Sequence, residues 1–177
     1  MTIPIYGKAH EARAGADFTW FVYGSSLDRA AFADWAQAHG YAVPDFALAR
    51  AARLPGWRLC FDVVSKHWGG AVASLAEAPG AFVEGLAVPM AGAARGLVEH
   101  KEGAVSGLYT AVEVTVQPVD AGPAVPAVAF RAAPGRRLPS DGPPSPAYLE
   151  VLRKGAREAG LSAEWQARLE ALGRPAA

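Results

Sequence analysis

Short stretches with the composition of β-strands follow one another through the middle of the chain, with no helical pattern between them. They are residues 57–62, 69–75, 82–88, 109–116 and 124–131, and residues 77–80 (EAPG) give a turn signal between the second and the third. Strands that succeed one another without a crossover helix pair antiparallel. The sequence therefore predicts an α+β fold, with a small β-sheet or barrel and flanking helices.

The pattern within these stretches predicts which side chains face the core. In 57–62, Trp57, Leu59 and Phe61 alternate with more polar neighbours, as in a half-buried strand. Pro126 has no backbone N–H to donate to a neighbouring strand. It should therefore confine the last stretch to an edge, or stand at the start of its strand.

One further strand and one helix are expected before this run. Phe18–Tyr23 (FTWFVY) is aromatic and β-prone, and it leads into a Gly-Ser-Ser turn. Residues 27–39 then place apolar side chains at i, i+4 and i+8, which predicts an amphipathic helix. Gly40 is the expected C-terminal cap of this helix.

Two more helices are expected after a Pro/Gly-rich linker at residues 132–144. Ser145 and Pro146 form a helix start, because Ser caps the free N–H groups and Pro is favoured at the first helical position. Gly160 should end this helix, and Ser162 should cap the last one. We therefore predict an N-terminal arm (1–17) and a single domain (18–173) with C-terminal helices at 145–173.

Composition excludes several classes of protein. Half of the 177 residues (51%) are hydrophobic, which rules out a disordered chain. Lys+Arg and Asp+Glu are 17 each, and this balance disfavours a nucleic-acid binder, which needs a basic excess. Cys60 is the only cysteine, so we expect no disulfide or Cys-based zinc site, and a place in the core for this thiol. Since no uncharged stretch approaches the roughly 20 apolar residues of a membrane span, we expect a soluble, cytoplasmic protein without a membrane or nucleic-acid partner.

Two segments combine residues that could carry chemistry. Residues 23–27 (YGSSL) turn from a strand into a helix, and the free N–H groups there suit a carboxylate. Residues 98–103 (VEHKEG) place acids, a His and a Lys at a junction before a strand, where burial can raise the pKa of a carboxyl group. Each segment taken alone also has a purely structural interpretation. Residues 23–27 can form an ordinary turn capped by Ser26, and residues 98–103 can form a solvated charged turn.

Other chemistries find little support. The four histidines show no spacing typical of metal ligands, so no metal site is predicted. A Ser/His hydrolase built on Ser25 or Ser26 lacks the G-x-S-x-G motif and any supporting spacing.

Together, the segments resemble the gamma-glutamylcyclotransferase family and its wider superfamily. Its Y-G-S-N-L loop reads YGSSL at 23–27, and its L-D-x-x-E-G segment reads VEHKEG at 98–103, with Tyr109 following. A C-terminal P-P-S-P-x-Y stretch reads PPSPAY at 143–148, and GAREAGL follows at 155–161. The similarity extends from about Phe18 to Leu172, and the order and spacing of the motifs make it specific.

The resemblance implies a small mixed, mainly antiparallel barrel and an enzyme that needs no cofactor and acts on a small gamma-glutamyl substrate. It implies that Glu102 is the catalytic acid/base. The implied substrate-binding residues are Tyr23, Gly24, Ser25, Ser26, Leu27, Tyr109 and Tyr148. The oligomeric state and the identity of the leaving amine stay open.

The implied reaction is physically sensible. In a gamma-glutamyl amide, the substrate's own α-amine can attack its γ-carbonyl and close a five-membered ring, which releases 5-oxoproline and a free amine. Such intramolecular attack reaches effective molarities of about 10⁵–10⁸ M when the geometry is held. A single carboxylate can then move the proton.

The chain departs from the family pattern at Ser26, where the family has Asn, and at Glu99, where it has Asp. The chain has no Asn anywhere, so compositional drift can account for the first change. If the family Asn contacts substrate through its side chain, activity or specificity would differ here. A non-catalytic domain that binds a small carboxylate, or serves as an interaction domain, is therefore the alternative.

Overall fold

The computed structural model describes residues 15–173, so most of the predicted N-terminal arm (1–14) lies outside the described residues. The strands are β1 (Phe18–Val22), β2 (Arg50–Ser65), β3 (Gly70–Met90), β4 (Tyr109–Pro118) and β5 (Val125–Ala132). The helices are α1 (Arg29–Ala38), α2 (Arg95–Lys101), α3 (Pro146–Glu158) and α4 (Ala163–Ala171), with 3-10 turns η1 (Ser25–Leu27), η2 (Gly92–Ala94) and η3 (Pro134–Arg136). None of the helices in residues 15–173 combines the length and the hydrophobicity that a membrane span requires.

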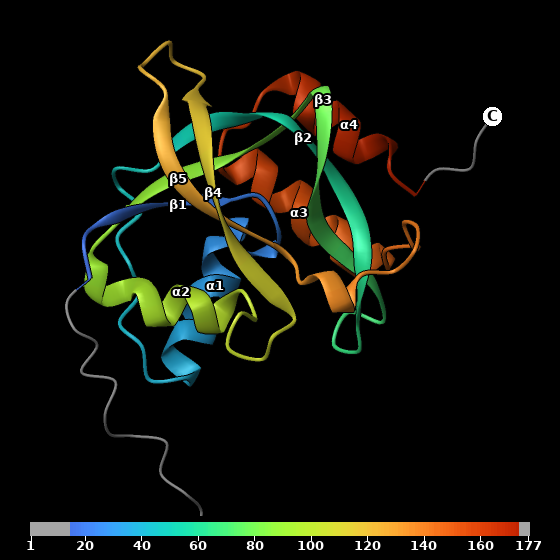
Figure 1. The fold of residues 1–177 in the computed structure, drawn as a ribbon, viewed down its shortest axis with the longest axis horizontal. Helices are drawn as coiled ribbons and strands as arrows, with labels where there is room; N and C mark the ends of the chain where they lie inside the picture. Colours follow the sequence, from blue (N-terminus) through green and yellow to red (C-terminus); the bar gives the residue numbers. More distant parts are fainter. Residues whose placement is uncertain (1–14, 174–177) are drawn as a thin grey trace, which may run out of the picture.

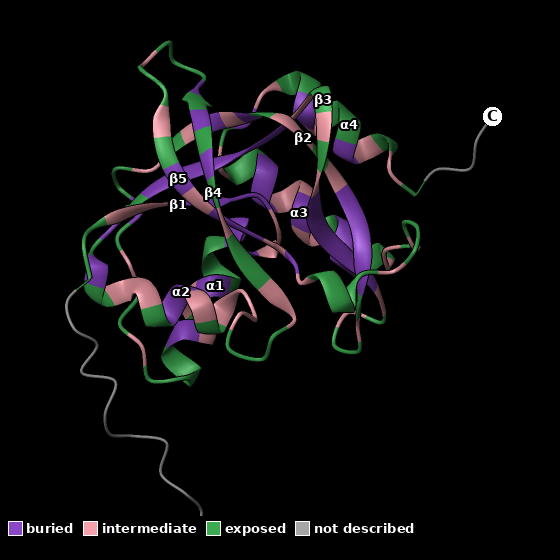
Figure 2. Ribbon diagram, viewed as in Figure 1, coloured by how far each residue is buried: buried purple, intermediate pink, exposed green. Residues whose placement is uncertain are grey.

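The strands form a closed barrel in the order β1-β3-β2-β4-β5 (Figure 1). The neighbours pair antiparallel, except that β1 and β5 are parallel where Trp20 lies opposite Val128. Buried side chains such as Trp20, Leu75 and Phe130 fill the core, and Figure 2 shows the buried residues along the strands. The predicted α+β class and the mixed, mainly antiparallel barrel are confirmed.

The predicted turn at residues 77–80 is wrong, because β3 is a single strand that runs through it. Both halves of β3 pair antiparallel with β2, and the register shifts between the pairs Pro55–Phe82 and Trp57–Glu77. Gly56 and Gly80 take positive φ values of 80° and 84° at this shift. The Pro-Gly signal thus marks a β-bulge, where extra residues bend a strand without reversing it.

The predicted inward face of residues 57–62 is only partly right. Phe61 is buried, but Trp57 and Leu59 are half-buried, while Cys60 and Asp62 are 0% and 3% exposed. The register shifts again between Cys60 and Val63, so simple alternation fails there. The prediction that Cys60 belongs to the core is confirmed.

Helix α1 begins later than the sequence pattern indicates. Ser25–Leu27 form the separate turn η1, and Asp28 caps α1 by accepting a hydrogen bond from the Ala31 N–H at 3.2 Å. Gly40 follows the helix with a φ of 74°, as predicted for a C-terminal cap. Because Asp28 does the capping, the Ser26 hydroxyl is available for another contact.

The predicted N-terminal caps of the last two helices are confirmed. The Ser145 and Ser162 hydroxyls accept hydrogen bonds from the N–H groups of Tyr148 and Trp165, at the starts of α3 and α4. In Figure 1, α1 and α2 lie on one side of the barrel, and α3 and α4 lie on another. The buried carboxylate of Glu84 on β3 bonds the N–H and hydroxyl of Ser162, which attaches α4 to the barrel.

Candidate functional site

A cavity of about 200 Å³ collects nearly all of the predicted site residues. Of these, Tyr23, Gly24, Ser25, Ser26, Glu102, Tyr109 and Tyr148 line it. The side chain of Leu27 is not brought to the cavity: it is buried in the core, with its Cβ against α3 at Gly155. The two sequence motifs, 76 positions apart, thus meet at one place.

The contact between those motifs is a hydrogen bond from Ser26 to Glu102. The Ser26 hydroxyl, on η1, donates to Glu102 Oε1 at 3.1 Å. Ser26 is 4% exposed, so this contact is shielded from water. Ser26 therefore supports the carboxyl group directly, which explains how Ser is accommodated where the family pattern has Asn.

Glu102 lies at the end of α2 rather than in a solvated turn. Its backbone N–H donates to the Val98 carbonyl at 2.9 Å, and Gly103 follows with a φ of 75° that turns the chain toward β4. Burial raises the pKa of the Glu102 carboxyl to about 7, while neighbouring Lys101 and the Ser26 hydrogen bond lower it. A carboxyl group with this pKa can both accept and release a proton near neutral pH.

Three tyrosine hydroxyls from different elements surround the same cavity. Tyr23, directly after β1, donates to the Phe130 carbonyl, and Tyr109 on β4 donates to the Ala73 carbonyl at 2.6 Å. Tyr148 on α3 accepts a hydrogen bond from the Ala73 N–H at 3.0 Å. Burial raises the pKa of each of these phenols, so they are neutral at physiological pH.

Sequence reasoning missed several lining residues. Lys101 brings an ammonium group, held 5.1 Å from the centre of the Trp35 ring, and burial lowers the pKa of that ammonium. Its place next to Glu102 in the chain was the available signal. Trp68, from the turn between β2 and β3, and Leu108 also line the cavity, and nothing in the local sequence pattern indicates them.

Other candidates lie away from the cavity. Glu99 forms an ion pair with Arg95 at 2.7 Å on the surface of α2. The His100 ring contacts Tyr41, with 3.0 Å between the hydroxyl and Nδ1. Burial raises the pKa of the Cys60 thiol to about 11, so it is not a thiolate nucleophile. Within residues 15–173, no three His, Cys, Asp or Glu side chains gather in a way that could hold a metal ion.

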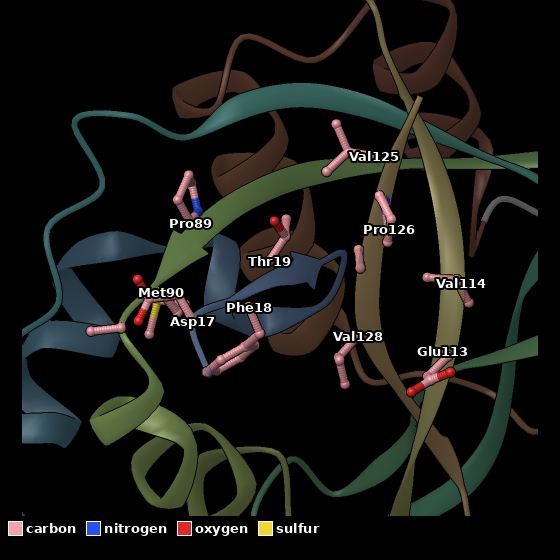
Figure 3. A pocket seen from close by; sticks show the side chains of 12 residues that line it. Asp17, Phe18, Thr19, Pro89, Met90, Glu113, Val114, Val125, Pro126 and Val128 are labelled. Carbon is pink, nitrogen blue, oxygen red and sulfur yellow. The ribbon is translucent and has the colours of Figure 1, made fainter. Parts of the chain in front are cut away.

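A larger groove of about 700 Å³ lies where β1 and β5 diverge, and Figure 3 shows its lining. Phe18, Pro126 and Val128 give it apolar walls, and Asp17 and Glu113 add carboxylates. None of the predicted site residues lines this groove. The smaller cavity is therefore the candidate site, because it holds the carboxyl group of raised pKa and the polar groups around it.

The comparison with curated proteins finds relatives of one kind. The chain is 29% identical over 162 residues to the gamma-glutamylcyclotransferase of Bos taurus, a match that covers 89% of this chain and 80% of the relative. It is 28% identical over 169 residues to the gamma-glutamylcyclotransferase of Mus musculus, with 93% and 84% covered. The sequence model of the AIG2-like family matches residues 83–169, from β3 to α4.

The solved structures agree with these relatives. A structure named gamma-glutamyl cyclotransferase superposes with a TM-score of 0.74 and 26% identity, and the match covers 91% of this chain and 90% of that one. The YkqA structure from Bacillus subtilis superposes with a TM-score of 0.72 at 22% identity, covering 90% of this chain and 56% of that one, and shows the shared fold alone. The chain is thus related in sequence to the gamma-glutamylcyclotransferases, the family that its motifs resemble, and has their fold.

Proposed function

We propose that this protein is a gamma-glutamyl cyclotransferase. It cleaves a gamma-glutamyl amine or peptide by attack of the substrate's α-amine on its own γ-carbonyl, and gives 5-oxoproline and a free amine. The observation that carries the proposal is the Glu102 carboxyl, whose pKa burial raises to about 7 inside the cavity where Ser26 and the three tyrosines converge. The names of the relatives support an enzyme of this family.

Glu102 is the proposed acid/base of the reaction. As a carboxylate it takes a proton from the substrate's α-ammonium, which frees the nitrogen lone pair for attack. As a carboxylic acid it later gives a proton to the leaving nitrogen. A pKa near neutrality suits both steps, because neither the protonated nor the ionised form is then strongly disfavoured.

The other cavity residues hold the substrate in the ring-closing geometry. The turn at Gly24–Ser26 offers backbone N–H groups at the start of η1 to the gamma-glutamyl part. Because the attacking nitrogen belongs to the substrate, the protein needs no nucleophile of its own. When the protein holds the substrate's side chain in a folded conformation, the entropic cost of ring closure is already met on binding. This explains how so few polar groups can suffice.

The first test is the release of 5-oxoproline from a panel of gamma-glutamyl compounds by wild type and by Glu102→Gln. The Gln variant keeps the size of the side chain but cannot exchange a proton, so kcat should fall about 10²–10⁴-fold. The matched control is Glu99→Gln, the same change three positions earlier, where the carboxylate pairs with Arg95 outside the cavity. It should retain wild-type turnover, and full activity in Glu102→Gln would contradict the proposal.

The alternative function is a non-catalytic domain that binds a small carboxylate. The substitution of Ser26 for the family Asn motivates it. In the structure, however, the Ser26 hydroxyl bonds Glu102 at 3.1 Å, so the acid is supported as a catalytic group would need. Formation of 5-oxoproline by wild type would rule this alternative out, and ligand binding without turnover would establish it.

A further inference from the structure

The hydrogen bonds that the cavity tyrosines already make determine what each can offer to a ligand. A phenol has one proton to donate and lone pairs that accept. A backbone carbonyl can only accept, and a backbone N–H can only donate. The partner of each hydroxyl therefore reveals whether its proton is committed.

Two of the three protons are committed. The Tyr109 hydroxyl donates to the Ala73 carbonyl at 2.6 Å, and the Tyr23 hydroxyl donates to the Phe130 carbonyl. These two oxygens have only lone pairs left for a substrate. Together with the Glu102 carboxylate, they give the cavity hydrogen-bond acceptors that suit an ammonium group.

Tyr148 has the opposite polarity. Its oxygen accepts from the Ala73 N–H at 3.0 Å, and the hydrogen bonds of residues 15–173 include none in which its hydroxyl donates. The hydroxyl lies across from Gly24, 3.8 Å from where a Cβ on that glycine would stand, and Tyr148 lines the cavity while only 3% exposed. Its proton is therefore free for a ligand, and the hydrogen bond from Ala73 strengthens it as a donor.

The arrangement of charge indicates which ligand atom meets this proton. Lys101 and Glu102 are adjacent at the end of α2, whereas Tyr148 comes from α3 and lines a different part of the same cavity wall. The α-ammonium and α-carboxylate of a gamma-glutamyl substrate stand on the same carbon, so they match Glu102 and Lys101 together. The γ-carbonyl, at the other end of the substrate's side chain, is then left for the donor on α3.

We propose that Tyr148 donates a hydrogen bond to the oxyanion that forms on the γ-carbonyl oxygen during ring closure. This inference rests on the proposed function. It assigns the one free phenol proton of the described cavity to the one negative charge that exists only during the reaction. Donors placed where charge develops lower the barrier more than they strengthen ground-state binding.

The step balances without a co-reactant. The α-nitrogen, after giving one proton to Glu102, bonds to the γ-carbonyl carbon, and the carbonyl π electrons move to oxygen, where Tyr148 donates. The carbonyl then re-forms, the bond to the leaving nitrogen breaks, and that nitrogen receives the proton from Glu102. The ring nitrogen loses a second proton to the released amine, so the products are 5-oxoproline and an ammonium ion.

The experiment compares Tyr148→Phe with Tyr109→Phe in steady-state kinetics on a cleaved gamma-glutamyl compound. Both variants lose one hydroxyl, and both leave one backbone group of Ala73 without its partner, so their effects on folding are closely matched. Tyr148→Phe should lower kcat about 10²–10³-fold with KM nearly unchanged, because the hydrogen bond strengthens when negative charge forms on the oxygen in the transition state. Tyr109→Phe should act mainly on KM.

The outcomes separate the inference from the proposed function. If wild type releases 5-oxoproline and Tyr148→Phe keeps its kcat within threefold, the inference is overturned and the proposed function stands. If wild type releases none from the whole panel, both are overturned. Should Tyr148→Phe fail to fold, 3,5-difluorotyrosine at position 148 keeps the shape and acidifies the hydroxyl. In this variant, kcat should begin to fall at a lower alkaline pH than in wild type, because the more acidic hydroxyl loses its proton sooner. An unchanged dependence of kcat on alkaline pH would overturn the inference.

Discussion

Two carboxyl groups in the barrel show how the surroundings of a residue decide its use. Glu84 is 0% exposed, and its oxygens bond Arg53 Nε at 2.9 Å, the Ser162 N–H at 2.9 Å and the Ser162 hydroxyl at 2.7 Å. Glu102 receives a side-chain hydrogen bond from Ser26, and burial dominates its pKa. Glu84 is thus occupied in joining elements, whereas Glu102 keeps a proton that it can exchange.

Glu102 should make the stability of the protein depend on pH. Its pKa rises from 4.5 to about 7 on folding, so between these values the folded state binds the proton more tightly than the unfolded chain. The stability conferred by that proton is present below pH 4.5 and is lost as the pH rises through about 7. The Glu102→Gln variant has a neutral side chain at this position and does not lose stability in this way.

Urea unfolding of wild type and Glu102→Gln at pH 5 and pH 8 measures this effect. The stability of the variant relative to wild type should rise between these pH values by at most about 3 kcal/mol. Glu99→Gln, on the solvent side of the same helix, should show no comparable change. A constant difference between wild type and Glu102→Gln would show that Glu102 titrates normally in the folded protein.

At the scale of elements, the site depends on how closely α3 approaches η1. Gly155 lies on the buried face of α3, and a Cβ there would stand 2.6 Å from Leu27 Cβ and 3.1 Å from the Asp28 nitrogen. The helix therefore rests on the backbone of the turn that carries Ser26. Since α3 also carries Tyr148, this one contact sets the spacing between two walls of the cavity.

Gly155→Ala should push α3 away from η1. The clash involves backbone atoms, so we expect a loss of about 1–3 kcal/mol in unfolding free energy, together with reduced turnover. Gly96→Ala is the matched control, because this exposed glycine in α2 has no atom within 4 Å of the added Cβ. That variant should be stabilised by about 0.4–1 kcal/mol. Equal stabilities of the two variants in urea unfolding would refute this account of the α3–η1 contact.

At the scale of the whole molecule, the cavity belongs to no single segment. Its walls come from the turn after β1, the β2–β3 turn, the first part of β3, the end of α2, the start of β4 and helix α3, regions that only the closed barrel brings together. A ligand in the cavity therefore contacts elements from both ends of the sequence. Its binding energy should add to the stability of the complete fold.

A thermal shift measured on Glu102→Gln tests this coupling without turnover. A γ-glutamyl dipeptide at about 100 times its Kd should add about 2.7 kcal/mol to the folded state. That corresponds to a rise in Tm of roughly 5–10 °C for a domain of this size. The α-glutamyl dipeptide of the same composition is the control ligand, because its peptide bond is made at the other carboxyl group. Equal shifts with both ligands would show that the cavity does not select the γ linkage.

Much of the local structure could be predicted from the sequence. The aromatic run of β1, the alternation of β4 and the serine caps of α3 and α4 all depend on neighbouring residues, so pattern and chemistry predict them. The resemblance to a known family brought Glu102, Ser26 and Tyr148 into one candidate site. Continuity of β3 through residues 77–80 was missed, because a bulge and a turn share the same Pro-Gly signal and differ only in how the partner strand continues.

The chemistry of the site follows from contacts that form only when the chain has folded. The pKa of Glu102 depends on burial by segments far away in the chain, and the direction of each tyrosine hydrogen bond depends on which backbone group of β3 or β5 stands opposite. Folding also placed the side chain of Leu27 in the core and brought Trp68 to the cavity. These properties arise from contacts between residues distant in sequence, and local patterns carry no information about such contacts.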